Sequence, residues 1–306
     1  TAVGKTALSI GLAKAIQGEI ISADSMQVYR GMDIGTAKIT KEQMDGVPHH
    51  LIDIMDPSDS FHVMAFQQKC KEAMEDIYAR HKIPILVGGT GFYIQSVLYD
   101  ISFTETDTDI EYRQKLQKIA EEQGGYVLHA RLAKIDPEAA DEIHPNNVKR
   151  VIRALEFNHQ TGEKISIHNE QERQKKSPYQ FRYYVLSLPR EILYDRINRR
   201  VDMMRRDGLV DEVKGLLQQG ITPNMVSMQG LGYKEIIDAL QGSCSFEEAF
   251  ERIKRETRHF AKRQFTWFRR ERDVTWIDKE TYENEDAILR YMIEDLKNAH
   301  ILPADQ

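Results

Sequence analysis

The chain has 306 residues, of which 41% are hydrophobic and 29% charged, and its formal net charge is −6. This composition is typical of a globular protein with a sizeable core, and the length allows one large domain or a domain with an insertion. The acidic balance excludes a uniformly basic protein that coats nucleic acid, and no apolar run approaches the ~18 residues that would cross a bilayer. The two cysteines, Cys70 and Cys244, match no metal-ligand spacing, which favours a reducing cytoplasm.

The sequence begins inside a phosphate-binding loop. Residues Thr1-Ala2-Val3-Gly4-Lys5-Thr6 match the second part of the pattern G-x-x-x-x-G-K-[ST], and an apolar helical stretch follows. In this motif backbone N–H groups surround a di- or triphosphate, the lysine reaches the same oxygens, and the Ser/Thr hydroxyl holds Mg²⁺. The first glycine and the strand that feeds the loop would precede Thr1, so we expect a truncated start. A chance Gly-Lys-Thr in a loop is the alternative.

Strands and helices alternate after the loop. Short apolar runs predict strands at residues 19–23, 50–54 and 84–87, and helical patterns cover about 63–80 and 92–98. This alternation predicts an α/β fold with a parallel sheet, in which ligands bind beyond the carboxyl ends of the strands. The phosphate-binding loop, Asp24 and the run Gly88-Gly89-Thr90 all belong to that edge, so we expect them to converge there.

The pattern changes after about residue 104. Helical periodicity without a clear strand continues to about residue 170, and Gln160-Thr161-Gly162 is typical of a helix end. Residues 183–188 then predict a strand that returns to the sheet, and residues 190–272 are again mostly helical. We therefore predict a P-loop NTPase-like core at 1–106 plus 178–306, with a C-terminal helical segment, and a helical insertion domain at 107–177.

Positive charge gathers in the C-terminal helical segment. Such a local basic face on an acidic protein is typical of a specific RNA or DNA contact, although from charge by itself an ordinary solvated helix face is the better explanation. Between residues 252 and 272 only two acids, Glu256 and Glu271, accompany nine basic residues: Arg252, Lys254, Arg255, Arg258, Lys262, Arg263, Arg269, Arg270 and Arg272.

The third predicted strand ends without an acidic residue. Most P-loop ATPases and GTPases place a Mg²⁺-organising Asp after an apolar strand, whereas this strand ends in Gly88-Gly89-Thr90. The carboxylate at the sheet edge is instead Asp24, which fits a nucleophile that needs a base better than it fits a second metal ligand. An Asp that caps a turn or helix explains Asp24 equally well.

The run from Asp24 to Lys38, D-S-M-Q-V-Y-R-G-M-D-I-G-T-A-K, resembles the signature of the bacterial tRNA dimethylallyltransferases. The resemblance extends to about residue 276, and the zinc finger of the eukaryotic members is absent. Further runs match this family in the same order: G-G-T at 88–90, I-H-P-N-N at 143–147 with Arg150 and Arg153, Arg196 and R-V-D at 200–202, L-G-Y at 231–233, and A-K-R-Q-F-T-W at 261–267.

The resemblance implies transfer of a dimethylallyl group from its diphosphate to the exocyclic amine of the adenosine just 3′ of the anticodon in tRNA. Asp24 would be the general base. The amides of the loop, Lys5 and a Mg²⁺ held by Thr6 would stabilise the diphosphate leaving group. Thr90 would donate to its bridging oxygen, and Arg200, with Arg196, would neutralise its charge. A turn residue and a solvent-exposed helix pair are the respective alternatives.

The family also implies how RNA is bound. Enzymes that do chemistry on a base take it out of the stack into a pocket, and here Asp24 and Thr90 would contact the adenosine while Ser25, Met26 and Gln27 line the pocket; for Met26 the alternative is core packing. We expect a monomer that does not bind a membrane. Its partners would be dimethylallyl diphosphate and the anticodon stem-loop of tRNA. The remaining RNA contacts are expected from Arg113, Lys149, Arg150, Arg153, Lys262, Arg263 and Arg269, the last three interleaved with Phe265, Trp267 and Phe268, of which some should be buried.

Three other functions remain open at this point. An adenylate prenyltransferase acting on free AMP or ATP would share the loop and the base but has less need for a helical insertion and a basic C-terminal segment. A P-loop kinase or NTPase would consume ATP and ignore a prenyl diphosphate. An RNA-binding protein without activity would leave the loop and Asp24 without a purpose.

Overall fold

The computed structural model describes residues 1–103 and 109–303 and divides the chain into two compact units. Unit 1 comprises Thr1–Leu98 and Tyr179–Gln306, and unit 2 comprises Tyr99–Pro178. The predicted boundary between residues 106 and 107 lies outside the described residues. Within the described ranges, no helix combines the length and the apolar character needed to cross a membrane.

A parallel three-stranded sheet with the order β2-β1-β3 forms part of unit 1. Its strands are β1 (Gly18–Ala23), β2 (His49–His50) and β3 (Ile83–Gly88). β1 and β3 pair from Gly18↔Ile83 to Ala23↔Gly88, so both strands end at the same level. This sheet confirms the predicted α/β fold, and it sends the residues after β1 and β3 out of one edge.

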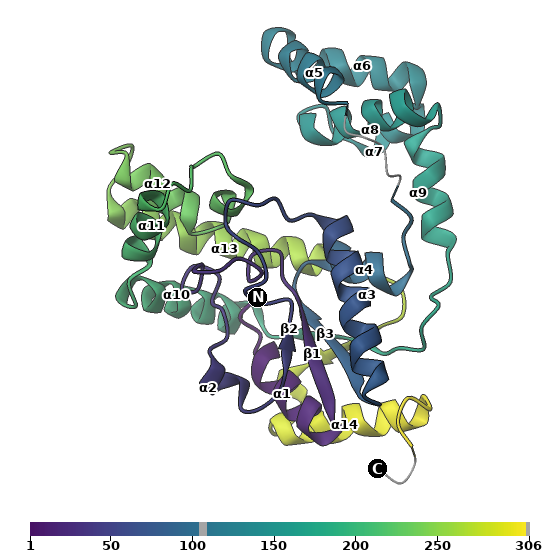
Figure 1. The fold of residues 1–306 in the computed structure, drawn as a ribbon, viewed down its shortest axis with the longest axis vertical. Coiled ribbons are helices and arrows are strands. Elements are labelled where there is room, and N and C mark those ends of the chain that lie inside the picture. Colours follow the sequence, from purple (N-terminus) through teal and green to yellow (C-terminus); the bar gives the residue numbers. More distant parts are fainter. Residues whose placement is uncertain (104–108, 304–306) are drawn as a thin grey trace. The chain divides into compact units, whose positions relative to one another are not determined.

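Alternate side chains of the strands face different helices, as the period of two in a strand requires. Ile20 packs with Ile10 of α1 (Lys5–Ala15), whereas Ile21 joins a cluster with Phe66 and Met74 of α3 (Val63–Ala79). The helices α1 and α3 therefore cover opposite faces of the sheet (Figure 1). The helix predicted at 63–80 is confirmed, and so is the one predicted at 92–98, which is α4 (Gly91–Leu98).

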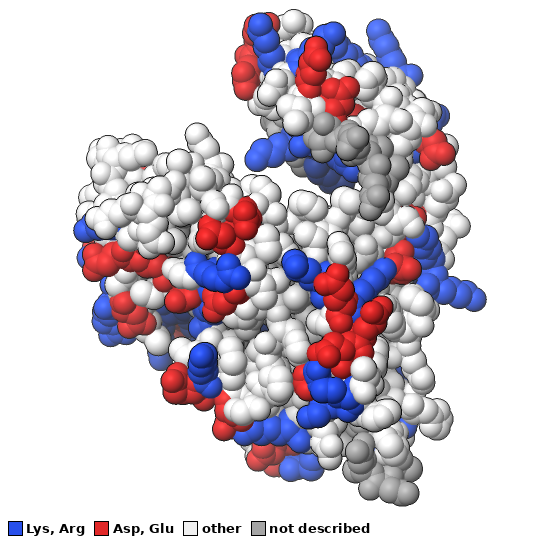
Figure 2. All heavy atoms as spheres, viewed as in Figure 1, with Lys and Arg blue, Asp and Glu red and all other residues white. Residues whose placement is uncertain are grey.

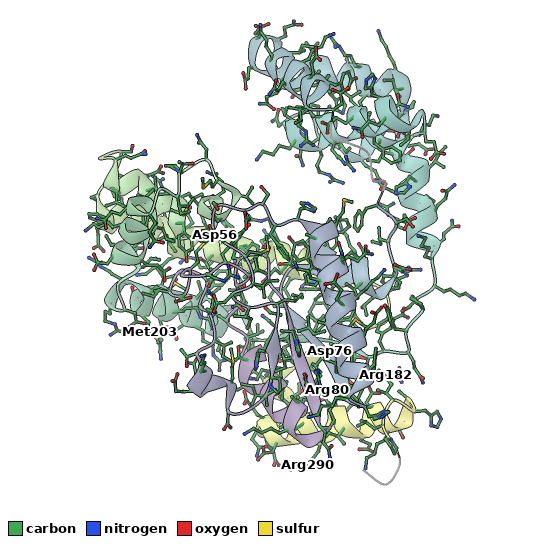
Figure 3. All side chains as sticks on the ribbon, viewed as in Figure 1. Asp56, Asp76, Arg80, Arg182, Met203 and Arg290 are labelled. Carbon is green, nitrogen blue, oxygen red and sulfur yellow. The ribbon has the colours of Figure 1, made fainter. Side chains whose placement is uncertain are left out.

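A buried carboxylate ties α3 to the sheet. Glu19 of β1 is 3% exposed and accepts hydrogen bonds from Arg80 Nη2 and His50 Nε2, both at 2.7 Å. Burial by itself would raise the pKa of Glu19, but these two bonds hold it below its ordinary value. Arg80 also pairs with Asp76 one helical turn away, and Figure 3 shows the two side chains together at the end of α3.

The strand predicted at 50–54 is wrong beyond its first residue. β2 ends at His50, because Leu51 and Asp53 adopt positive φ angles of 61° and 55°, which extended backbone does not allow. The chain instead returns to the core through an isolated bridge between Tyr29 and Met55.

The strand predicted at 183–188 forms as β4 (Tyr183–Ser187), but it does not join the three-stranded sheet within the described residues. It pairs in parallel with β5 (Val274–Asp278), which was not predicted. After the short 3₁₀ turn Lys279–Thr281, α14 (Glu285–Asn298) packs against α1. Gly11 permits this approach, because a Cβ there would lie 2.8 Å from Leu289 Cδ1.

The rest of unit 1 is helical, as predicted for residues 190–272. α13 begins with a capping box in which Ser245 and Glu248 satisfy each other's backbone N–H groups. The elements are α2 (Lys41–Met44), α10 (Arg190–Arg206), α11 (Leu209–Gln218), the 3₁₀ helix Val226–Gln229, α12 (Tyr233–Leu240) and α13 (Phe246–Phe268).

Unit 2 is a bundle of helices around its own apolar core, which includes Leu128, Leu132 and Leu155. Gly162, with a φ of 74°, ends α8 at the predicted place. Asp136 accepts from Ala139 N and from both the N and Oγ of Ser166, which ties two helices of the bundle together. The helices are α5 (Ile110–Gln123), α6 (Gly125–Ile135), α7 (Pro137–Glu142), α8 (Val148–Thr161) and α9 (Ile165–Gln174).

Candidate active site

Two of the predicted catalytic residues lie at the carboxyl ends of neighbouring strands. Asp24 directly follows β1, and Thr90 follows β3 after one further glycine, Gly89. The backbone N–H of Thr90 donates to the carbonyl oxygen of Ala23 at 3.3 Å, which joins the two strand ends. Gly88 is required at this contact, because a Cβ there would lie 2.0 Å from the same carbonyl oxygen.

One oxygen of Asp24 caps the turn that follows it. Asp24 Oδ1 accepts from the backbone nitrogens of Met26 at 2.9 Å and Gln27 at 3.4 Å. Asp24 therefore does cap a turn, as the alternative prediction for this residue said. Within the described residues its Oδ2 has no recorded partner, so one carboxylate oxygen is available as a proton acceptor.

The phosphate-binding loop leads into α1 as its sequence predicts. Gly4 is the residue before the helix and has a φ of 85°, a left-handed conformation that suits glycine. The helix begins at Lys5, so its first N–H groups and its positive dipole end face the loop. Thr6 is exposed in the first turn. This geometry is suited to an anion.

Charges surround the loop from three elements. The pKa of the Lys5 ammonium is lowered, mainly because the group is buried. The Asp24 carboxylate opposes this shift and the Arg200 guanidinium adds to it, so the three charges interact. The surrounding protein also desolvates the Arg200 guanidinium and lowers its pKa, although the residue keeps exposed surface. A Cβ at Gly4 would lie 3.9 Å from Arg196 Nη1, which places the second predicted arginine beside the loop.

For two residues near the phosphate-binding loop, Lys279 and Gln264, the sequence predicted no role in the site. Lys279 Nζ lies beside the loop, 2.8 Å from where a Cβ of Gly4 would be, and pairs with Glu285 at 2.6 Å. Gln264 of α13 accepts from the Thr1 nitrogen at 2.9 Å and donates to the Gly89 carbonyl at 2.8 Å, so it links the phosphate-binding loop to the residue before Thr90. Gln264 lies inside the A-K-R-Q-F-T-W run at 261–267, but its contact partners are distant in sequence.

The predicted base pocket follows Asp24. Gln27 holds a fixed orientation: its Nε2 donates to the carbonyls of Thr36 at 3.3 Å and Ala37 at 3.4 Å, and its Oε1 accepts from Ser22 Oγ at 3.3 Å. Ser25, Met26 and Gln27 are all partly exposed. Met26 also packs against Gly230, where a Cβ would lie 2.5 Å from its Cε, so it contributes to packing as well.

The basic run on α13 divides into two halves. In the first half, cations are engaged within the protein: Arg252 pairs with Asp238, Lys254 with Asp202 and Arg258 with Asn198. In the second half, the exposed residues Lys262, Arg263, Arg269 and Arg270 are in no recorded ion pair of the described chain. On the visible face Lys and Arg are interspersed with Asp and Glu, so no single-sign surface covers it (Figure 2).

The three aromatic rings interleaved with these cations differ in exposure. Phe268 is 8% exposed and belongs to the core, and Phe265 stacks on Trp276 with ring centroids 6.0 Å apart. Trp267 is 37% exposed and lies 6.1 Å from the ring of Phe92. Of the three, Trp267 is therefore the ring that remains accessible to a nucleic-acid base.

The cations predicted in unit 2 also fall into two groups. Arg113 is held by Glu156 through two bonds, 2.7 Å from Nε and 2.8 Å from Nη2, and these bonds raise its pKa. Glu156 is 1% exposed, so Arg113 neutralises a buried charge. Lys149, Arg150 and Arg153 are exposed on α8 and have no recorded ion pair within the described residues.

The sequence profile of the IPP transferases matches residues 27–271. The chain belongs to the IPP transferase family. This result confirms the resemblance carried by residues 24–38. A tRNA dimethylallyltransferase of Lachnoclostridium phytofermentans is 57% identical over 302 residues, which cover 99% of this chain and 96% of the relative. One from Bacillus cereus is 52% identical over 292 residues, which cover 95% of this chain and 92% of the relative.

Solved structures of IPP transferases share the fold. The crystal structure of the tRNA isopentenylpyrophosphate transferase from Bacillus halodurans superposes with a TM-score of 0.72 at 47% identity, covering 98% of this chain and 95% of that one. A eukaryotic dimethylallyltransferase acting on tRNA gives a TM-score of 0.80 at 32% identity, covering 100% of this chain and 79% of that one.

Proposed function

We propose that this protein transfers a dimethylallyl group from dimethylallyl diphosphate to the exocyclic amine of the adenosine 3′ of the anticodon in tRNA. The observation that carries the proposal is the meeting of Asp24, Thr90 and the phosphate-binding loop at one sheet edge, in a chain of the IPP transferase family. Relatives that match it over nearly its whole length carry the corresponding name.

The acceptor amine needs a base. Its lone pair is delocalised into the adenine ring, so it becomes nucleophilic only as its proton leaves. Asp24 Oδ2 takes that proton while the nitrogen bonds to the allylic carbon. Asp24 Oδ1 meanwhile holds the turn that carries the base pocket, because it accepts from Met26 and Gln27.

The leaving group needs stabilisation as the carbon–oxygen bond breaks and negative charge grows on the diphosphate. The N–H groups of residues 2–6, Lys5 and Arg200 face this charge, and the Thr90 hydroxyl donates to the bridging oxygen. The amides at the start of α1 are held by the backbone before the substrate binds, so they need little reorganisation.

The site fits a magnesium ion. Mg²⁺ is usually bound by one or two protein oxygens together with substrate phosphates and water, and the described residues contain no cluster of three His, Cys, Asp or Glu that would hold a metal by itself. The exposed Thr6 hydroxyl in the first turn of α1 is a suitable oxygen ligand. When bound, Mg²⁺ would neutralise charge on the diphosphate.

The RNA contacts come from both units. In unit 1, Lys262, Arg263 and Arg269 bind phosphates, and Ser25, Met26 and Gln27 surround the extruded adenine. In unit 2, the exposed Lys149, Arg150 and Arg153 contact the anticodon stem. Arg113 fixes α5 to α8 through Glu156 and reaches the RNA from that position. The protein acts in the cytoplasm as a monomer.

The exposed cations distinguish this function from an adenylate prenyltransferase. A free nucleotide has too few phosphates to use the exposed cations of both α8 and α13. A kinase or NTPase would not require the pocket residues that follow Asp24. An RNA-binding protein without activity would not require Asp24 as a general base.

A mass measurement tests the proposal. The purified protein is incubated with Mg²⁺, dimethylallyl diphosphate and an anticodon stem-loop carrying adenosine 3′ of the anticodon, with AMP and ATP as parallel acceptors. We expect the stem-loop to gain one dimethylallyl group and the free nucleotides to gain none. Modification of AMP or ATP, or consumption of ATP without transfer, would refute the proposal.

A further inference from the structure

Glu212 on α11 binds three successive backbone N–H groups of a loop distant in sequence. Its Oε2 accepts from Asp33 at 2.9 Å and Ile34 at 2.7 Å, and its Oε1 accepts from Gly35 at 3.1 Å. Consecutive N–H groups that converge in this way form a typical binding site for an anion. Here the anion is a side chain of the protein itself, so the loop is held to α11.

Tyr233 completes this arrangement from α12. Its hydroxyl donates to Glu212 Oε1 at 2.7 Å, and its side chain is fully buried. Burial raises the pKa of Tyr233 strongly and the Glu212 carboxylate raises it further, so the hydroxyl remains a donor. Gly35 lies directly on this ring, since a Cβ there would be 2.5 Å from Tyr233 Cε2 and Cζ.

Lys38 fixes the other end of the same loop. Its Nζ donates to the Tyr29 carbonyl at 2.6 Å, to Asp33 Oδ1 at 2.7 Å and to Asp53 Oδ1 at 2.5 Å, and its side chain is 4% exposed. All three hydrogens of the ammonium are therefore used within the protein. The loop from Asp33 to Lys38 is held by a carboxylate at its start and by an ammonium at its end.

The middle of this loop orients Gln27. The carbonyls of Thr36 and Ala37 accept from Gln27 Nε2, and its Oε1 accepts from Ser22 Oγ. The amide can therefore offer a bound base only the second lone pair of its oxygen. A shift of the loop would release the amide to rotate. Glu212 thus acts on the pocket through one loop, without contact to any reacting atom.

We propose that Glu212 is a positioning residue for the acceptor base: it holds the Asp33–Ala37 loop so that Gln27 presents its amide oxygen in the pocket. This inference rests on the proposed function. Dimethylallyl diphosphate binds to the other side of the site, at the phosphate-binding loop, so loss of Glu212 should affect binding of the two substrates unequally.

The test compares Glu212→Gln with the control Asp211→Asn. The amide of Glu212→Gln has one acceptor oxygen and turns an NH₂ group towards the loop N–H groups. Asp211 is the neighbouring acid, its side chain is 84% exposed, and it pairs only with Lys214 among the described residues. Hydrogen exchange of peptides covering 33–37 and the Kd of each substrate are measured for both variants.

We expect faster exchange of the loop in Glu212→Gln and a stem-loop Kd raised about tenfold, because hydrogen bonds to a charged acceptor are stronger than those to a neutral amide. The Kd of dimethylallyl diphosphate should change less than about twofold, and Asp211→Asn should resemble the wild type. Gly35→Ala displaces the same loop without changing charge and should shift the stem-loop Kd in the same direction.

Unchanged exchange, or equal losses of affinity for both substrates, would overturn the inference. If the wild-type protein binds the stem-loop but transfers nothing to it, the proposed function fails. In that case, the hydrogen exchange and the stem-loop Kd of Glu212→Gln and Asp211→Asn still decide whether Glu212 positions the loop for RNA binding.

Discussion

The backbone N–H of Thr90 donates to the carbonyl oxygen of Ala23, the residue directly before Asp24, at 3.3 Å. This bond fixes the distance between the proposed base and the proposed donor to the leaving group through the main chain. The hydroxyl of Thr90 takes no part in it, so the hydroxyl can be removed without disturbing the link between β1 and β3.

Thr90→Val should lower kcat by about 10²-fold, the effect of removing one preorganised donor to a developing negative charge. The valine keeps the shape and the backbone bond, so Kd for the stem-loop should change less than about twofold. Steady-state kinetics and a binding titration check this, and Thr90→Ser is the control that should retain most activity. A valine variant with wild-type kcat would remove Thr90 from the mechanism.

Arg269→Ala should weaken stem-loop binding and reduce the slope of log Kd against log salt concentration by about one, the loss of about one phosphate contact. Arg252→Ala is a matched control on α13, the helix that Arg269 directly follows, because Arg252 already pairs with Asp238 at 2.7 Å. Its salt slope should equal that of the wild type. Identical slopes for the two variants would contradict the division of the basic run into a paired half and an RNA-binding half.

Glu271 should make the protein less stable as the pH rises towards neutrality. Burial raises its pKa to about 7, and Oε1 accepts from Gln95 at 3.2 Å, while Oε2 is buried and has no hydrogen-bond partner among the residues that the structure describes. Its folded pKa exceeds the unfolded value, so the unfolded chain releases this proton first. This group's contribution to stability therefore falls between about pH 4.5 and pH 7 and is constant above.

Replacement of Glu271 by Gln removes this titration. The variant should gain about 1–3 kcal/mol in the free energy of unfolding relative to the wild type between pH 4.5 and pH 8. Urea unfolding of both proteins at these two pH values measures the change. A difference between variant and wild type that is the same at both pH values would show that the carboxyl titrates normally.

The sequence was sufficient to predict the helices and strands that depend on local patterns. The apolar runs of β1 and β3, the helical period of α3 and the glycine after α8 all predicted what formed. The rule that the strands of a parallel sheet end at one edge then predicted that Asp24 and Thr90 lie together. These successes share a cause: each depends on neighbours within a few residues, or on a rule of topology.

The remainder depended on contacts that no local pattern encodes. The hydrogen bonds from Asp33–Gly35 to Glu212 and the two hydrogen bonds of Gln264 join residues more than 170 positions apart. β2 stops at His50 because of positive φ angles at non-glycine residues, which propensity does not anticipate. β5 has a β-branched, aromatic sequence that could have been identified, but its pairing with β4 rather than the main sheet could not.

The most direct test of the mechanism is the rate of a single turnover in Asp24→Asn. Asparagine keeps an oxygen at Oδ1 to cap Met26 and Gln27 but cannot take a proton, so it separates the two roles of this residue. With enzyme in excess over bound substrates, transfer to the stem-loop should slow by about 10²–10⁴-fold, while Kd for the stem-loop stays within a few-fold of wild type. Transfer at the wild-type rate would show that Asp24 is not the base and that it serves only to cap the turn.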